Sequence, residues 1–231
     1  VLHAEVCVDE ILGVTRILKA SITEYFVSVY LFSLQKIFMD HNLKRNKKTH
    51  QVLRIQVPVN MRSKFPSRTM RNFSLFVLPE IDLRLGTYTF EEILRSVHLQ
   101  LQISSDIKQI SRFLSSNVSH EKLFLIRILP LFIKEIALAI VYRKLASKRF
   151  TGLVTNLGQV VLPEEMEEMI DAFELIPPPP NAKVKAGIGL ISYKNKLRIC
   201  FSNITRSFEL EQQMVKYLSD AGIHVKILKY D

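Results

Sequence analysis

The sequence predicts an α/β fold, a two-layer sandwich in which helices cover a mixed β-sheet. First, runs with the two-residue period of a strand alternate with runs of helical period along the whole chain. Second, the strand-like segments 185–193 and 196–203 are separated only by Lys194 and Asn195, so they form an antiparallel hairpin. Third, strand-helix-strand successions elsewhere allow parallel neighbours. A sheet that contains both kinds of pairing is a mixed sheet.

The expected elements follow one another in a defined order. A strand at 2–8 leads into a helix at 9–20 and then into a helix at 21–40, where Ser21 and Glu24 form a capping box. Further strands are expected at 51–60, 72–83, 151–157, 185–193, 196–203 and 223–230. Further helices are expected at 89–116, 119–147 and 207–222, with a short one opened by Pro163. The four prolines at 177–180 form a stiff connector or, alternatively, a ligand for a groove that recognises polyproline helices.

The composition is that of a globular protein. The 231 residues are 48% apolar and 23% charged, which is enough for a substantial core. Cys7 and Cys200 lie far apart inside apolar runs, so we expect reduced core thiols and a cytoplasmic location. The sequence opens without a visible secretory signal. The most apolar run, 123–142, is interrupted by charged residues and by Pro130, so we expect a buried helix there and no membrane span.

The net charge of +10 raises the question of anionic partners. The densest basic run, 44–48, fits either a solvated loop or a contact with an anion. No zinc-finger spacing, helix-turn-helix pattern or RNA-binding signature accompanies this run, so a nucleic-acid partner is not expected.

The familiar motifs of enzyme active sites are missing from the sequence. It has no glycine-rich phosphate loop, no GxSxG elbow, no HExxH and no CxxC pair. None of the six histidines has a carboxylate or a second histidine at a spacing that indicates an acid-base pair. We therefore expect no catalytic residues and no metal site in this chain.

Several short motifs nevertheless occur in a characteristic order. They are the capped helix SITEYFVSVYLFSL, the strand and arginine VPVNMR, an NF that opens the next strand, TNLG before a proline-opened helix, and LRICFSN followed by SFELEQQMVKYLSDAGIHVKI. This succession resembles the C-terminal lobe of the CoA-dependent acyltransferase superfamily, in particular its alcohol-acetyltransferase-like and condensation-domain-like branches. The resemblance covers nearly the whole chain. It implies a single domain over residues 1–231 with the fold of a chloramphenicol-acetyltransferase-like lobe.

In that family two similar lobes meet at a cleft, and a tunnel between them admits an acyl thioester from one face and an acceptor alcohol or amine from the other. The N-terminal lobe carries an HxxxD motif, in which the histidine is the general base and the aspartate pairs with an arginine of the other lobe. No HxxxD occurs in this sequence. The resemblance therefore implies a C-terminal lobe whose catalytic histidine is supplied by a missing N-terminal lobe.

Arg62, at the end of VPVNMR, matches the family arginine that forms this salt bridge between the lobes. An arginine suits the role because its planar guanidinium can bind a carboxylate through two hydrogen bonds and stays charged in a partly dry interface. An ordinary exposed arginine at a strand end is the alternative. Asn72 matches the asparagine of a GN pair in relatives, and we expect it to have a structural role, although Arg71 stands where glycine is usual.

Thr155 and Asn156 of the TNLG motif fall where relatives place a small hydroxyl or amide near the tunnel. The resemblance implies that they donate hydrogen bonds to the oxyanion of a tetrahedral intermediate. A turn in which Asn156 and Gly158 satisfy local backbone groups is the alternative. Basic residues on or near the hairpin would suit the phosphates of coenzyme A, or form a solvated face; they are Lys183, Lys185, Lys194, Lys196 and Arg198.

The function that the resemblance implies is acyl transfer from a CoA or carrier thioester to an alcohol or amine. Acyl-CoA would be the co-substrate, no cofactor would be bound covalently, and the N-terminal lobe of the same protein would be the partner. The chain alone is not expected to be active. The alternative is a non-catalytic binding module whose basic surface holds a partner protein or an anionic ligand, because the chain lacks the histidine and has a charge of +10.

Overall fold

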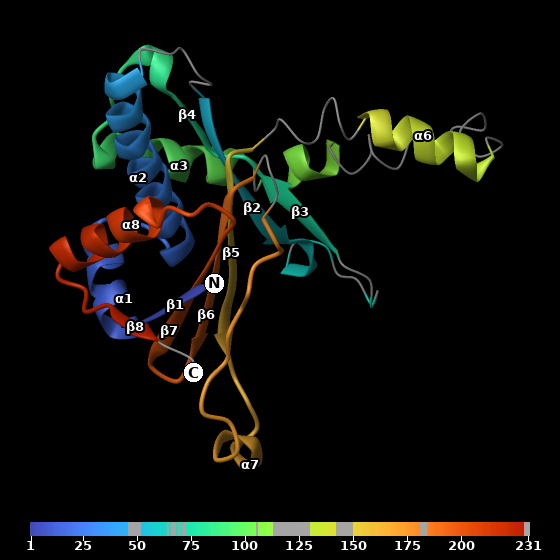
Figure 1. The fold of residues 1–231 in the computed structure, drawn as a ribbon. Helices are drawn as coiled ribbons and strands as arrows, with labels where there is room; N and C mark the ends of the chain where they lie inside the picture. Colours follow the sequence, from blue (N-terminus) through green and yellow to red (C-terminus); the bar gives the residue numbers. More distant parts are fainter. Residues whose placement is uncertain are drawn as a thin grey trace.

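A computed structural model describes residues 1–45, 52–63, 65, 68, 70, 73–104, 106–112, 130–141, 150–180 and 184–228 (Figure 1). The strands are β1 (Leu2–Cys7), β2 (Val52–Asn60), β3 (Ser74–Val77), β4 (Glu80–Asp82), β5 (Gly152–Val160), β6 (Ala186–Tyr193), β7 (Lys196–Asn203) and β8 (Lys226–Leu228). The α-helices are α1 (Val8–Ile17), α2 (Ile22–Arg45), α3 (Phe90–Ser104), α6 (Leu131–Val141), α7 (Glu164–Glu167) and α8 (Glu209–Asp220). Two single turns of 3-10 helix are η1 (Met61–Ser63) and η2 (Leu83–Leu85).

All eight strands belong to one mixed sheet, in the order β3-β2-β5-β6-β7-β1-β8. The remaining strand, β4, pairs with the first half of β2, whereas β3 pairs with its second half. The pairs β2/β5 and β5/β6 are parallel, and the other pairs are antiparallel. The predicted hairpin of β6 and β7 is present, with Tyr193 opposite Lys196 and Lys194 in a left-handed conformation at the turn (φ 50°). The predicted α/β class and mixed sheet are confirmed.

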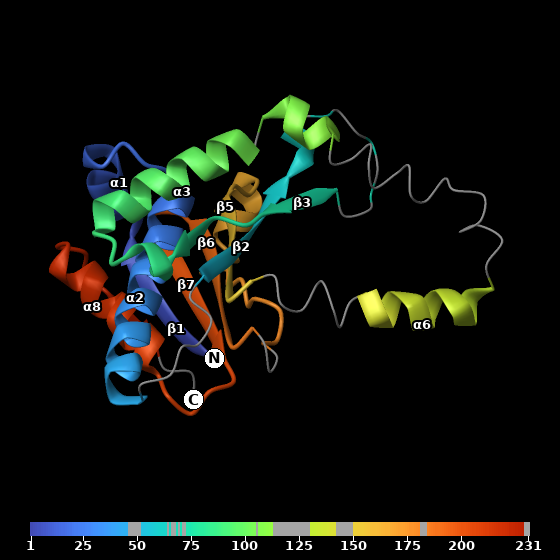
Figure 2. The ribbon, with the colours of Figure 1, turned by 90° about the horizontal axis from the view of Figure 1, so that it is seen from above.

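Helices α1, α2, α3 and α8 cover one face of the sheet (Figures 1 and 2). The central helix of this layer is α2, whose Tyr25, Phe26, Tyr30 and Leu31 are almost completely buried. Its N-terminus has the predicted capping box, because the Ser21 N–H donates to Glu24 Oε2 (2.6 Å) and the Glu24 N–H to Ser21 Oγ (3.2 Å). Because these side chains are buried, α2 forms the core of the helical layer.

The other face of the sheet is covered over β6 by residues 168–180, which we call the strap. All eight residues of β6 are buried, as in a strand that is covered on both faces. The strap approaches so closely that a Cβ on Gly189 would lie 1.9 Å from the Leu175 carbonyl oxygen. Farther along β6, the ring of Tyr193 packs edge-on against Phe173 at 5.1 Å between centroids. The predicted connector at 177–180 begins inside this covered region, since Pro177 is buried.

Three expected elements differ from the structure. The strand expected at 72–83 is divided into β3 and β4 around Leu78 and Pro79, because Pro79 has no N–H to continue a ladder, although its carbonyl accepts from the Ile55 N–H (3.0 Å). The helix expected at 89–116 ends as α3 at Ser104, and a separate helical segment follows at 107–112, where the Lys108 N–H donates to Asp106 Oδ1 (2.9 Å). The expectation of a buried helix at 123–142 is wrong for the described part, since α6 stands apart from the sheet and leaves Leu131 and Ile136 mostly exposed (Figure 2).

None of the described helices is by itself both long and apolar enough to cross a membrane. Val8–Ile17 and Ile22–His41 meet that criterion only as a pair, and the chain bends by 81° between them.

Candidate functional site at the carboxyl end of the parallel strands

Arg62 lies directly after β2, in the turn η1. The neighbouring Met61 is 1% exposed and anchors the turn in the core, whereas Arg62 is exposed. The Arg62 N–H donates to Asn60 Oδ1 (3.0 Å), which fixes the backbone where the strand ends. Because Met61 is buried and Arg62 is exposed, Arg62 lies at the surface at the end of β2, the strand between β3 and β5 in the sheet.

The predicted oxyanion residues lie on the next strand of the sheet. Because β2 and β5 are parallel, with Ile55 opposite Gly152, the carboxyl ends of both strands lie at the same edge of the sheet. Thr155 and Asn156 are therefore at the same end of the sheet as Arg62. Both are half-buried.

Asn156 also has a clear local role. Its Nδ2 donates to Thr23 Oγ1 at the start of α2 (3.0 Å), and its Oδ1 accepts from the Gly158 N–H (2.9 Å). The ladder between β5 and β6 shifts register here, and Gly158 has φ 83°, as in a bulge that favours glycine. The turn interpretation left open by the sequence therefore describes the local hydrogen bonds of Asn156, and the oxyanion role stays a prediction.

A cavity of about 380 Å³ lies beside the turn that carries Arg62. Its wall is formed mainly by apolar side chains of β2, η1, β3, the end of α3 and the helical segment 107–112, among them Val59, Met61, Leu75, Phe76, Ile103 and Ile110. A cavity of this size and composition suits an apolar group of a small ligand.

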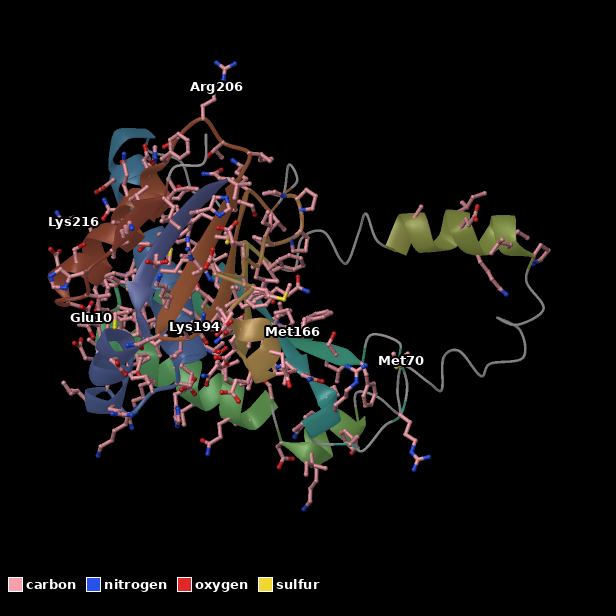
Figure 3. All side chains as sticks on the ribbon, turned by 90° about the horizontal axis from the view of Figure 1, so that it is seen from below. Glu10, Met70, Met166, Lys194, Arg206 and Lys216 are labelled. Atoms are coloured by element: carbon pink, nitrogen blue, oxygen red, sulfur yellow. The ribbon has the colours of Figure 1, made fainter. Side chains whose placement is uncertain are left out.

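The basic residues near the hairpin do not form one cluster. Lys185, Lys194 and Lys196 are exposed, and Lys194 Nζ donates to the Glu167 carbonyl of α7 (3.1 Å; Figure 3). The side chain of Arg198 is only 15% exposed and binds Glu5 Oε2 at 3.0 Å, so it belongs to an internal network. Asn72, Arg71, Lys183 and most of the run 44–48 lie outside the described residues.

The structure also brings together histidines and glutamates that are far apart in the sequence. The pairs are His41 with Glu209 (2.8 Å), His98 with Glu24 (2.9 Å), His224 with Glu10 (3.1 Å) and His3 with Glu174 (3.1 Å). No local spacing could have predicted them, because the partners of the first three pairs are separated by 168, 74 and 214 positions. The His224 N–H donates to Glu10 and holds the pKa of that carboxyl below its usual value.

Comparison with known proteins finds solved structures with a similar fold, but no matching family model or curated sequence. The trichothecene 15-O-acetyltransferase TRI3 from Fusarium sporotrichioides has a TM-score of 0.58 and 12% identity, over 96% of this chain and 47% of its own. The nonribosomal peptide synthetase FmoA3 has a TM-score of 0.55 and 14% identity, over 95% of this chain and 22% of its own. The epimerization domain TycB3(E) of tyrocidine synthetase B has a TM-score of 0.53 and 11% identity, over 95% and 47%.

These likenesses extend over almost all of this chain but over less than half of each matched chain. At identities of 11–14% they establish the architecture alone. The resemblance predicted from the order of motifs is confirmed at that level: the chain has a condensation-domain-like and CoA-acyltransferase-like fold.

Proposed function

We propose that the chain is the C-terminal lobe of a CoA-dependent acyltransferase and acts with an N-terminal lobe that carries an HxxxD histidine. One observation carries the proposal. The fold match to an acetyltransferase includes 96% of this chain but only 47% of that enzyme. A chain that corresponds to half of a two-lobe enzyme would supply one wall of a shared active site.

In this proposal the histidine of the N-terminal lobe takes the proton of the acceptor alcohol or amine. The acceptor oxygen or nitrogen attacks the thioester carbonyl, the tetrahedral intermediate collapses, and the thiol of coenzyme A or of a carrier leaves with a proton. The reaction exchanges one acyl bond for another and needs no redox partner.

Arg62 would be a positioning residue for this chemistry. Its exposed guanidinium could bind the aspartate of the HxxxD motif bidentately, and the aspartate would in turn fix the loop that holds the histidine. Once the two lobes are joined, loss of one member of such a buried ion pair costs roughly 3–5 kcal/mol, because the other charge stays buried without its partner.

The same end of the sheet offers room and polarity for the substrate. The apolar cavity beside Met61 would take a hydrocarbon part of the acyl group or of the acceptor. Thr155, half-buried on β5, would donate to the oxyanion, an interaction worth about 3 kcal/mol of barrier in other enzymes. Exposed Lys194 and Lys196 would attract the phosphates of coenzyme A.

The experiment compares two proteins: this chain alone, and the chain joined to the segment that its gene encodes ahead of Val1. Release of free thiol from acetyl-CoA is measured with a panel of alcohols and amines. We expect transfer by the joined protein and none by the chain alone. Transfer by the chain alone would refute the division of labour between lobes. An upstream segment without HxxxD, together with no transfer by the joined protein, would favour the binding module.

A further inference from the structure

Three side chains that can bind a metal ion meet on the face of the sheet beneath the strap. His3 lies on β1, Cys200 lies opposite it on β7, and Glu174 comes from the strap. His3 Nδ1 is 3.1 Å from Glu174 Oε2 and 3.6 Å from Cys200 Sγ. The three potential ligand atoms all lie within 4.8 Å of one another.

Two of these distances, from nitrogen to oxygen and from nitrogen to sulfur, are close to the edges of a tetrahedral zinc-type site. With metal-nitrogen and metal-oxygen bonds near 2.0–2.1 Å and a metal-sulfur bond near 2.3 Å, tetrahedral geometry separates nitrogen from oxygen by about 3.3 Å and nitrogen from sulfur by about 3.6 Å. The nitrogen-sulfur distance already has this value, and the nitrogen-oxygen distance is slightly shorter. The oxygen and the sulfur lie within 4.8 Å of each other, so the third edge is also in the range that one shared ion can close.

The charges around the cluster are also suitable. A thiolate and the Glu174 carboxylate together neutralise a divalent cation. Within the described part of the chain, Arg198 pairs with Glu5 at 3.0 Å and more loosely with Glu174 at 4.0 Å, so Arg198 and Glu5 together add little net charge beside the cluster.

We propose that His3 Nδ1, Cys200 Sγ and a carboxylate oxygen of Glu174 bind a thiophilic divalent cation of the zinc class. The Cys200 thiol gives up its proton to solvent when the metal-sulfur bond forms, so one proton is released for each ion bound. Water completes the coordination, and Glu174, whose side chain is 26% exposed, leaves a path for it. The bound ion connects the strap to β1 and β7 and stabilises the packing of the strap on this face of the sheet. The proposal is independent of the acyltransferase assignment.

The chain supplies its own control for the role of Cys200. Cys7 lies on the same strand as His3 and is also a free thiol, but its Sγ contacts the Asn195 amide at 3.5 Å, outside the cluster. A Cys7→Ser variant therefore keeps the cluster, whereas Cys200→Ser removes its sulfur ligand.

The experiment titrates Co²⁺ into the full chain, without a histidine tag, after metal has been removed under reducing conditions. We expect one ion per chain, a near-ultraviolet thiolate-to-cobalt band that Zn²⁺ displaces, and a higher melting temperature. The Cys7→Ser variant keeps the band and Cys200→Ser loses it. Glu174→Gln weakens binding at least about tenfold.

Absence of the band in the wild-type chain at millimolar Co²⁺, or a band of full intensity in Cys200→Ser, would overturn the proposal. If Cys200→Ser does not fold, Glu174→Gln decides the question, because Glu174 is partly exposed and amide replacement keeps its shape. If Glu174→Gln binds Co²⁺ with unchanged affinity, Glu174 is not a metal ligand and its contact with His3 is only a salt bridge. That result would refute the site.

Discussion

At the residue scale, Gly189 is the described glycine whose Cβ position lies nearest to another backbone atom, the Leu175 carbonyl oxygen of the strap. Gly189→Ala should destabilise the chain by about 2–3 kcal/mol, because the new methyl group would meet the Leu175 carbonyl oxygen and force the strap away from β6. Gly13→Ala is the matched control: nothing lies within 4 Å of its Cβ position in α1, so it should stabilise the chain by about 0.5–1 kcal/mol. Urea unfolding measures both. Equal stabilities of the Gly189→Ala variant and the wild type would show that the strap does not pack as described.

Two buried tyrosines on α2 provide a second test. Tyr30 donates its hydroxyl to the Ala186 carbonyl of β6 at 3.0 Å, whereas the Tyr25 hydroxyl is buried without a hydrogen-bond partner among the described residues. Tyr30→Phe should cost about 1 kcal/mol of unfolding free energy, and Tyr25→Phe should be neutral or stabilising. The change in unfolding free energy, measured by thermal and denaturant unfolding, should therefore differ between the two variants in sign or in size. A larger loss in Tyr25→Phe than in Tyr30→Phe would contradict the placement of α2 on the sheet.

Single residues were predictable where local chemistry decides their surroundings. The capping box of Ser21 and Glu24 follows from spacing alone, and the exposure of Arg62 after a buried strand follows from its charge. The cluster of His3, Glu174 and Cys200 could not be predicted, because it depends on the register of β1 with β7 and on the path of the strap. The expectation that the chain lacks a metal site came from sequence spacing, which does not report on such distant residues.

At the element scale, most boundaries could be predicted because hydrophobic periodicity and caps are local. The strand at 72–83 was divided by Pro79, and the helical region at 89–116 was divided near Asp106. Burial was harder to predict than helix formation. The apolar sequence of α6 forms a helix, as its composition favours, but composition does not say whether another element covers it.

The pairing of Glu10 with His224 ties α1 to the segment before β8 and should be visible in the pH dependence of stability. The His224 N–H donates to Glu10 Oε2 at 2.7 Å and lowers the pKa of Glu10 in the folded chain. Its stabilising contribution is therefore complete above the ordinary glutamate pKa and disappears as the pH falls through the lowered one. In urea unfolding, the wild-type chain should have a higher unfolding free energy than Glu10→Gln, and this difference should decrease as the pH falls from about 6 to 3. The unfolding free energy of Glu168→Gln should have the same pH dependence as that of the wild type. An advantage of Glu10 that is independent of pH would exclude this role.

At the scale of the whole molecule, the α/β class and the mixed sheet follow from the sequence because the hairpin and the crossovers leave few other arrangements. The strand order and the strap over the second face depend on contacts between distant segments, on which local patterns give no information. The same holds for the proposed partnership of two lobes. In our proposal this fold would supply one wall of a shared active site, and the exposed Arg62 is the side chain through which we expect the second lobe to be held.

The most direct test of this claim is kcat/KM for acyl transfer by the chain joined to its N-terminal lobe, measured for Arg62→Ala, Arg62→Lys and Arg206→Ala. Arg206 is an exposed arginine at the opposite end of β7 from Lys194 (Figure 3). We expect Arg62→Ala to lower kcat/KM at least about tenfold and to lower the melting temperature of the joined protein. Arg62→Lys should recover part of both, and Arg206→Ala should change neither. Full activity and stability in the Arg62→Ala protein would contradict this claim.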